Sequence, residues 1–143
     1  MARANRRRTE GAHEVFVDTS AFFVLADARD REHARVAAWI REATVPLVTS
    51  EYVFAETVSL LTKRMGKRAA IQFGDGLRRS QNVSVLGVTE DYRERAWRLF
   101  AGRPDQRFDF VDATSAVMME ALGIRQVCGL DSDFRTMGFE LVP

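Results

Sequence analysis

Four acidic residues sit beside apolar segments, where a chain that only had to fold would rarely place them. They are Asp18, Glu56, Asp112 and Asp131. An ionised carboxylate near an apolar core is costly unless it is paired, protonated or bound to a cation. Carboxylates without a cluster of histidine or cysteine are hard oxygen ligands, which suit Mg²⁺ or Mn²⁺ and suit zinc poorly. Such an ion could orient a water and stabilise the charge that develops when a phosphodiester is cleaved.

Two of these acids have structural explanations that we consider weaker than metal binding. Asp18 follows the apolar run 15–17 and could accept hydrogen bonds from the turn into the next helix. Glu56 lies on the helical stripe formed with Val53 and Leu60, and its main structural alternative is a buried pair with an arginine. We favour a functional role for both.

The other two acids are ambiguous by position. Asp109 could be the N-cap of a helix and Asp112 its third residue, a capping box that the helix dipole also favours. That explanation and metal binding are equally good for Asp112. Asp131 and Asp133 could simply form a loop or the start of a helix.

Short apolar runs alternate with amphipathic segments along the chain. Strands are expected at 14–18, 46–49, 83–86, 125–130 and 139–142, and helices at 19–26, 30–43, 50–65, 67–80, 89–101 and 109–122. This alternation predicts a three-layer α/β domain with a central, mostly parallel sheet of about five strands. Ligands of such sheets gather beyond the carboxyl ends of the strands. Asp18 and Asp131 should therefore meet there.

Bulk composition allows this interpretation without proving it. The chain has 143 residues, with 29% charged and 46% hydrophobic residues, as in ordinary soluble domains. We expect one domain over 14–143 and a basic, disordered tail over 1–13. No apolar run is long enough to cross a bilayer. A lone Cys128, read as a small core residue, suits the cytoplasm, and His13 and His33 are read as surface residues.

Four ordered motifs resemble those of PIN-domain ribonucleases. The matching runs are VFVDTS at 15–20, TSEYVFAET at 49–57, FVDATS at 110–115 and LDSDF at 130–134, followed by Gly138 and Phe139. The set is similar to the VapC-type toxins of bacterial toxin–antitoxin pairs, from about residue 14 to the end. This resemblance implies a Mg²⁺- or Mn²⁺-dependent endoribonuclease, usually a homodimer, held inactive by an antitoxin. It implies that Asp18, Glu56, Asp112 and Asp131 bind the metal, with Asp109 and Asp133 as candidates for an outer layer of contacts.

The chain departs from the motifs of these ribonucleases at two positions. Asp109 stands where a serine is common, which preserves capping and adds a negative charge near the metal. Gly129 replaces a hydroxyl residue and removes a hydrogen bond that could orient a ligand. A basic rim for phosphates is also conceivable, although charged helix faces are usually just solvated. Its members are Lys63, Arg64, Lys67, Arg68, Arg78 and Arg79.

Other functional classes fit less well. A dehalogenase-like phosphatase needs a second aspartate two residues after the first, where Ser20 stands. A receiver domain needs an aspartate at the end of its third strand, where Leu86 and Gly87 stand. The serious rival is an inactive PIN-like module that binds RNA or a protein without cutting, because sequence alone does not fix the spacing of the acids.

Overall fold

A five-stranded parallel sheet forms the centre of the part of the chain that the structure describes. The computed structural model describes residues 13–143, so nearly all of the expected N-terminal tail lies outside the described residues. The strands are β1 (Val15–Val17), β2 (Leu47–Ser50), β3 (Val83–Leu86), β4 (Gln126–Cys128) and β5 (Glu140–Val142). Their order in the sheet is β3-β2-β1-β4-β5, and every neighbouring pair is parallel. The predicted three-layer α/β architecture is confirmed.

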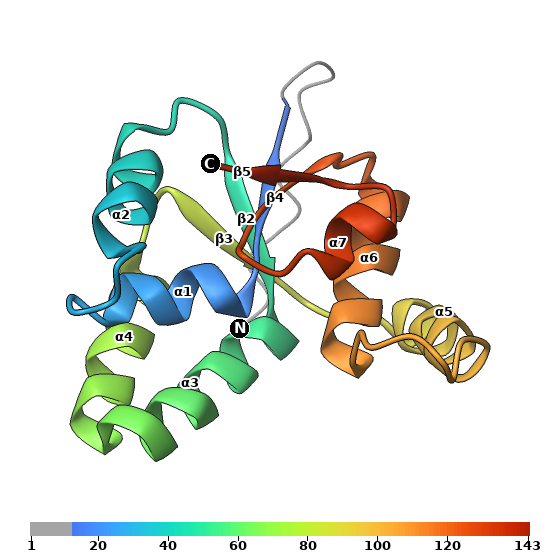
Figure 1. The fold of residues 1–143 in the computed structure, drawn as a ribbon, viewed down its shortest axis with the longest axis horizontal. Helices are drawn as coiled ribbons and strands as arrows, with labels where there is room; N and C mark the ends of the chain where they lie inside the picture. Colours follow the sequence, from blue (N-terminus) through green and yellow to red (C-terminus); the bar gives the residue numbers. More distant parts are fainter. Residues whose placement is uncertain (1–12) are drawn as a thin grey trace.

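Helices cover both faces of the sheet (Figure 1). Those of the described residues are α1 (Thr19–Ala26), α2 (His33–Glu42), α3 (Glu51–Met65), α4 (Lys67–Arg79), α5 (Glu90–Ala101), α6 (Phe110–Leu122) and α7 (Asp133–Thr136). In Figure 1, α1 and α2 lie on one side of the sheet and α5, α6 and α7 on the other, while α3 and α4 run side by side below.

Local signals explain where most of the helices begin and end. The Ser50 side chain accepts a hydrogen bond from the Val53 N–H and so caps α3. Gly66, with φ of 94°, separates α3 from α4, and Gly123, with φ of 70°, ends α6. These positive φ values favour glycine, which has no Cβ to clash.

Two predicted boundaries need correction. The second helix starts at His33 rather than residue 30, because the Asp30 side chain accepts from the Glu32 N–H and holds a turn there. The fourth strand ends at Cys128, two residues early. The Gly129 N–H still donates to the Val142 carbonyl oxygen of β5, but the Leu130 N–H donates to the Ser20 hydroxyl of α1 instead of to a strand. The first helix has the predicted bounds and is capped by Asp18.

The core is centred on β1, whose three residues are at most 1% exposed. A second, smaller cluster lies between α5 and α6 and includes Ala96 and Val117. Cys128 is fully buried, as expected, and His13 is exposed. His33 is half-buried rather than a free surface residue, because its Nδ1 lies 2.9 Å from the Val24 carbonyl oxygen. None of the helices in residues 13–143 is long and apolar enough to cross a membrane.

The strand order places a topological switch at β1. The chain moves from β1 to β2 and β3 on one side, and β4 then pairs with β1 on the other side. Connections therefore leave the carboxyl ends of β1 and β4 in opposite directions. A crevice at such a point is the usual ligand site of an open α/β sheet.

Candidate active site

The carboxyl end of the sheet gathers the four acids from four different elements. Asp18 directly follows β1, and Asp131 lies three residues after the end of β4. Glu56 lies in the second turn of α3, which starts at the end of β2, and Asp112 lies in the first turn of α6. Asp18 and Asp131 were expected to meet at the switch, and they lie within electrostatic reach of each other. Burial is the main cause of the raised pKa of Asp18, and the charge of Asp131 adds to the rise.

Asp18 is the most buried of the four, with 4% of its surface exposed. Its Oδ2 accepts hydrogen bonds from the Ser20 N–H at 3.2 Å and the Ser20 hydroxyl at 2.8 Å. Its Oδ1 is buried and has no hydrogen-bond partner among residues 13–143. Burial raises the pKa of Asp18 and outweighs the opposing effects of Ser20 and of the Thr19 N–H, which does not reach full hydrogen-bond geometry. The capping explanation thus holds for one oxygen and leaves the other unexplained.

Asp112 takes part in a capping box with Asp109. The Asp112 N–H donates to Asp109 Oδ1 at 2.9 Å, and the Asp109 N–H donates to Asp112 Oδ2 at 3.1 Å. Burial raises the pKa of Asp112 to about 8, and the negative charges of Asp109, Asp18 and Asp131 add to the rise. The capping box needs Asp109 but neither Asp18 nor Asp131, so the local role does not account for the whole setting of this carboxyl.

Glu56 is half-buried on α3 without the arginine partner that would explain it structurally. Within residues 13–143 it forms no ion pair. Burial is the main cause that raises its pKa, followed by the charge of Asp109 and, more weakly, that of Asp18. The Thr19 side chain opposes this rise because it favours the ionised form of Glu56, although the Thr19 hydroxyl does not reach full hydrogen-bond geometry.

Asp131 has a local role as well as an electrostatic one. Its Oδ1 accepts from the Asp133 N–H at 2.9 Å, and its carbonyl oxygen accepts from the Phe134 N–H where α7 begins. The loop explanation is therefore correct for that oxygen. Its charge also raises the pKa values of Asp18 and Asp112. The Asp133 carboxylate is not among the causes of either shift.

The donor chemistry at this edge suits a hard divalent cation. The buried, unpartnered Oδ1 of Asp18 is the kind of atom that a cation would satisfy, and repulsion among the acids is what a cation would relieve. Burial raises the pKa of the Cys128 thiol to about 12, which favours its protonated form. Across residues 13–143, however, no three Asp, Glu, His or Cys side chains are grouped tightly enough to hold an ion as they stand. The metal site therefore remains a proposal.

The basic residues expected to form a rim do not surround the acids. All six are exposed, on the last turn of α3 and at the two ends of α4. At about 1.5 Å per residue, Lys63 lies about 10 Å along the α3 axis from Glu56. These positions favour the solvated-face interpretation.

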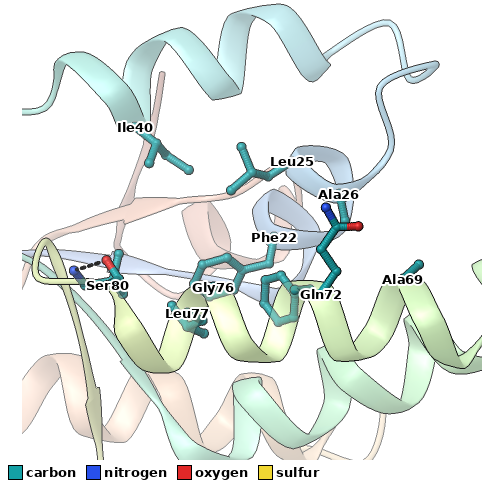
Figure 2. Close-up of a pocket in the computed structure, with 11 residues that line it drawn as sticks. Phe22, Leu25, Ala26, Ile40, Ala69, Gln72, Gly76, Leu77 and Ser80 are labelled. Carbon is teal, nitrogen blue, oxygen red and sulfur yellow. Dashed lines mark hydrogen bonds between the residues drawn. The ribbon is translucent and has the colours of Figure 1, made fainter.

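One cavity is mostly apolar and has none of the four acids in its lining. It has a volume of about 400 Å³ and lies between α1, α2 and α4 (Figure 2). Phe22, Leu25, Ile40 and Leu77 are among its lining side chains, and none of the four acids contributes. In it Phe22 meets Phe73 edge-on, with ring centroids 5.3 Å apart. This groove has the character of a docking surface rather than a catalytic one.

Sequence reasoning missed one residue of this site, Ser20. Its hydroxyl contacts both Asp18 and the Leu130 N–H. A hydroxyl two residues after an acid at a strand–helix junction is the only local signal for such a contact.

Comparison with known proteins identifies the family. The profile of the PIN domain matches residues 15–140. The chain belongs to the PIN-domain family. It is 37% identical over 126 residues to the 23S rRNA-specific endonuclease VapC20 of Mycobacterium tuberculosis, covering 87% of this chain and 95% of that protein. It is 29% identical over 121 residues to the ribonuclease VapC26 of the same species, covering 82% and 86%.

Solved structures agree with this PIN-domain assignment. The crystal structure of M. tuberculosis VapC20, described as a sarcin–ricin loop cleaving toxin, superposes with a TM-score of 0.82 at 35% identity, covering 87% of this chain and 95% of that one. VapBC2 from Rickettsia felis matches with a TM-score of 0.66 at 10% identity, covering 90% and 97%. The second likeness shows the fold alone.

Proposed function

We propose that this PIN-domain protein is a metal-dependent endoribonuclease of the VapC type. The observation that carries the proposal is the electrostatic coupling of Asp18 with Glu56, Asp112 and Asp131, together with one Asp18 oxygen that is buried and unpartnered within residues 13–143. Similarity to two VapC ribonucleases over most of the chain supports the same reaction class.

The four carboxylates are the proposed holders of Mg²⁺ or Mn²⁺. When bound, such an ion lowers the pKa of a water and stabilises the charge on a phosphodiester under attack. The chain itself supplies oxygen ligands from rigid element ends, and the capping box fixes the turn of α6 that carries Asp112. Hydrolysis adds water across a P–O bond, and no side-chain nucleophile is needed.

We propose RNA as the substrate and 23S rRNA as the first RNA to test. The relative that is 37% identical is a 23S rRNA-specific endonuclease, which supports this choice. No observation favours the inactive-module alternative, because all four acids are present and interact electrostatically.

An antitoxin is the proposed protein partner. α1 begins at Asp18 and carries Phe22 and Leu25 into the apolar groove, so a partner segment lying along α1 could reach both the groove and the acids. An arginine of that segment could pair with a carboxylate through two hydrogen bonds. As a toxin, this protein should stop cell growth when it is expressed alone. Co-expression with the antitoxin, expected from the gene next to this one, should restore growth, and the two proteins should elute as one complex. Restored growth with separate elution would contradict this mechanism.

A cytoplasmic homodimer is the proposed assembly. Trp97 is 56% exposed and contacts Phe100 in a tilted and Phe110 in an edge-on arrangement, with ring centroids 5.8 and 6.0 Å away, so an aromatic patch reaches solvent. Light scattering should give twice the mass of the chain, and Trp97→Glu should give the monomer. A wild-type monomer at micromolar concentration would refute the assembly.

The decisive experiment is cleavage of purified 23S rRNA with and without a chelator. Cleavage should require Mg²⁺ or Mn²⁺, stop with chelator and return when excess ion is added. Millimolar Mn²⁺ should also raise the melting temperature, since a ligand that binds only the folded state stabilises it. Cleavage that persists in chelator would refute the metal requirement. If Mn²⁺ stabilises the protein but no RNA is cut, the inactive-module alternative stands.

A further inference from the structure

The Ser20 hydroxyl connects two parts of the site that are far apart in the sequence. It donates to Asp18 Oδ2 at 2.8 Å and accepts from the Leu130 N–H at 2.9 Å. Leu130 immediately precedes Asp131 and is 110 residues away from Ser20. A capping hydroxyl would serve only its own helix, whereas this one also holds the loop after β4.

Gly129 leaves the space that this hydroxyl occupies. A Cβ at position 129 would lie 3.1 Å from Ser20 Oγ and 3.2 Å from Asp18 Cβ, both tighter than ordinary van der Waals contacts. The backbone at Gly129 does not have a positive φ, so the glycine is needed for space rather than for conformation. Any larger residue would press on the atoms that position the Asp18 carboxylate.

We infer that Ser20 is a positioning residue of the acidic site, and that Gly129 is the space it requires. The Ser20 hydroxyl engages Asp18 Oδ2, which leaves Oδ1 as the oxygen free to bind a cation. Through the Leu130 N–H it holds the loop that carries Asp131 at a fixed place beside Asp18. The expected effect on metal binding rests on the proposed function, whereas the two hydrogen bonds of Ser20 do not depend on that function.

The first test needs neither metal nor RNA. Amide hydrogen exchange at Leu130 should speed up roughly two- to tenfold in Ser20→Ala, the size expected for one lost hydrogen bond. Ser20→Thr keeps the hydroxyl and should keep the slow exchange. Thr62→Ala is the matched control, because its hydroxyl bonds only to the Val58 carbonyl of its own helix. Unchanged exchange in Ser20→Ala would overturn the inference.

The second test measures Mn²⁺ affinity by calorimetry. Loss of a group that orients a metal ligand typically weakens binding 10- to 100-fold, so Ser20→Ala should weaken Mn²⁺ by roughly tenfold, with affinity restored in Ser20→Thr. Gly129→Ala should also weaken Mn²⁺ binding, because its Cβ crowds Ser20 Oγ and Asp18 Cβ. The same substitution should weaken binding less in the Ser20→Ala background, where the Ser20 Oγ atom is absent. Full additivity would overturn the role given to Gly129.

The outcomes separate this inference from the proposed function. If the wild type binds no Mn²⁺ and cuts no RNA, the function fails, while Leu130 exchange still decides whether Ser20 holds the loop. If the wild type binds and cuts but Ser20→Ala binds Mn²⁺ equally well, the positioning role alone is wrong.

Discussion

Two helices begin at the same edge of the sheet with an aspartate cap, and the two caps behave differently. Asp18 caps α1 by accepting from the Ser20 N–H, and Asp109 caps α6 by accepting from the Asp112 N–H. Their backbones are alike, with φ of −89° at both, although only Asp109 takes part in a capping box. Asp18, however, is 4% exposed and has a raised pKa, whereas Asp109 is exposed.

The difference comes from what surrounds each cap rather than from the cap itself. Asp18 follows a fully buried strand at the centre of the sheet, so its second oxygen is buried and accepts no hydrogen bond from residues 13–143. Asp109 follows the exposed connection after α5, where solvent reaches it. A helix cap therefore becomes a metal-ligand candidate only where burial leaves an oxygen unsatisfied.

The largest expected effect is at Asp18. Asp18→Asn should lower metal-dependent RNA cleavage by at least about 100-fold, because charge stabilisation by a bound ion contributes several kcal/mol. Asparagine still caps a helix, so the metal-free melting temperature should not fall. Asp30→Asn is a suitable control, since Asp30 also accepts from a nearby backbone N–H but lies away from the site. Wild-type cleavage by Asp18→Asn would remove Asp18 from the site.

The next effect is a pH dependence centred on Asp112. Its pKa is about 8 in the folded protein and near 3.8 otherwise, so between about pH 4 and about pH 8 the folded state binds more protons than the unfolded state. The free energy of unfolding of the metal-free protein should therefore fall as pH rises through this window and level off above it. Mn²⁺ competes with those protons, so its affinity should rise over the same range.

Urea unfolding at several pH values with chelator checks the sign. Asp112→Asn should flatten the slope only in part, because the pKa values of Asp18 and Glu56 are raised in the same direction. A metal-free protein that becomes more stable between about pH 5 and about pH 8 would contradict the burial of these acids.

The sequence predicted the sheet and most helices, because apolar periodicity and capping residues are local signals. Ser50 and Gly66 flank α3, whose bounds lie within one residue of the predicted 50–65. The contact from Ser20 to the Leu130 N–H could not be predicted, since it joins positions 110 residues apart. Nor could periodicity show that Asp18 keeps one oxygen without a partner, because that depends on packing around β1.

The smallest effect, and the sharpest test of the comparison, is at Asp109. Its Oδ1 accepts from the Asp112 N–H, so Asp109→Ala should lose about 0.5–2 kcal/mol of stability, whereas Asp109→Ser, which still caps, should be nearly neutral. Both substitutions remove a negative charge that raises the pKa values of Glu56 and Asp112, so both should lower those two pKa values slightly.

Mn²⁺ titration then separates a cap from a ligand at Asp109. A cap predicts that Asp109→Ser binds Mn²⁺ almost as well as the wild type, while Asp109→Ala binds less well because the first turn of α6, and Asp112 with it, is less firmly held. A ligand predicts equal losses in both, because neither supplies a carboxylate. We expect the first pattern, since Asp109 is exposed and its Oδ1 is already engaged in the capping box. If Asp109→Ser and Asp109→Ala weakened Mn²⁺ binding equally while Asp109→Ser kept its stability, Asp109 would be a fifth carboxylate ligand. Asp18 and Asp109 would then differ only in burial.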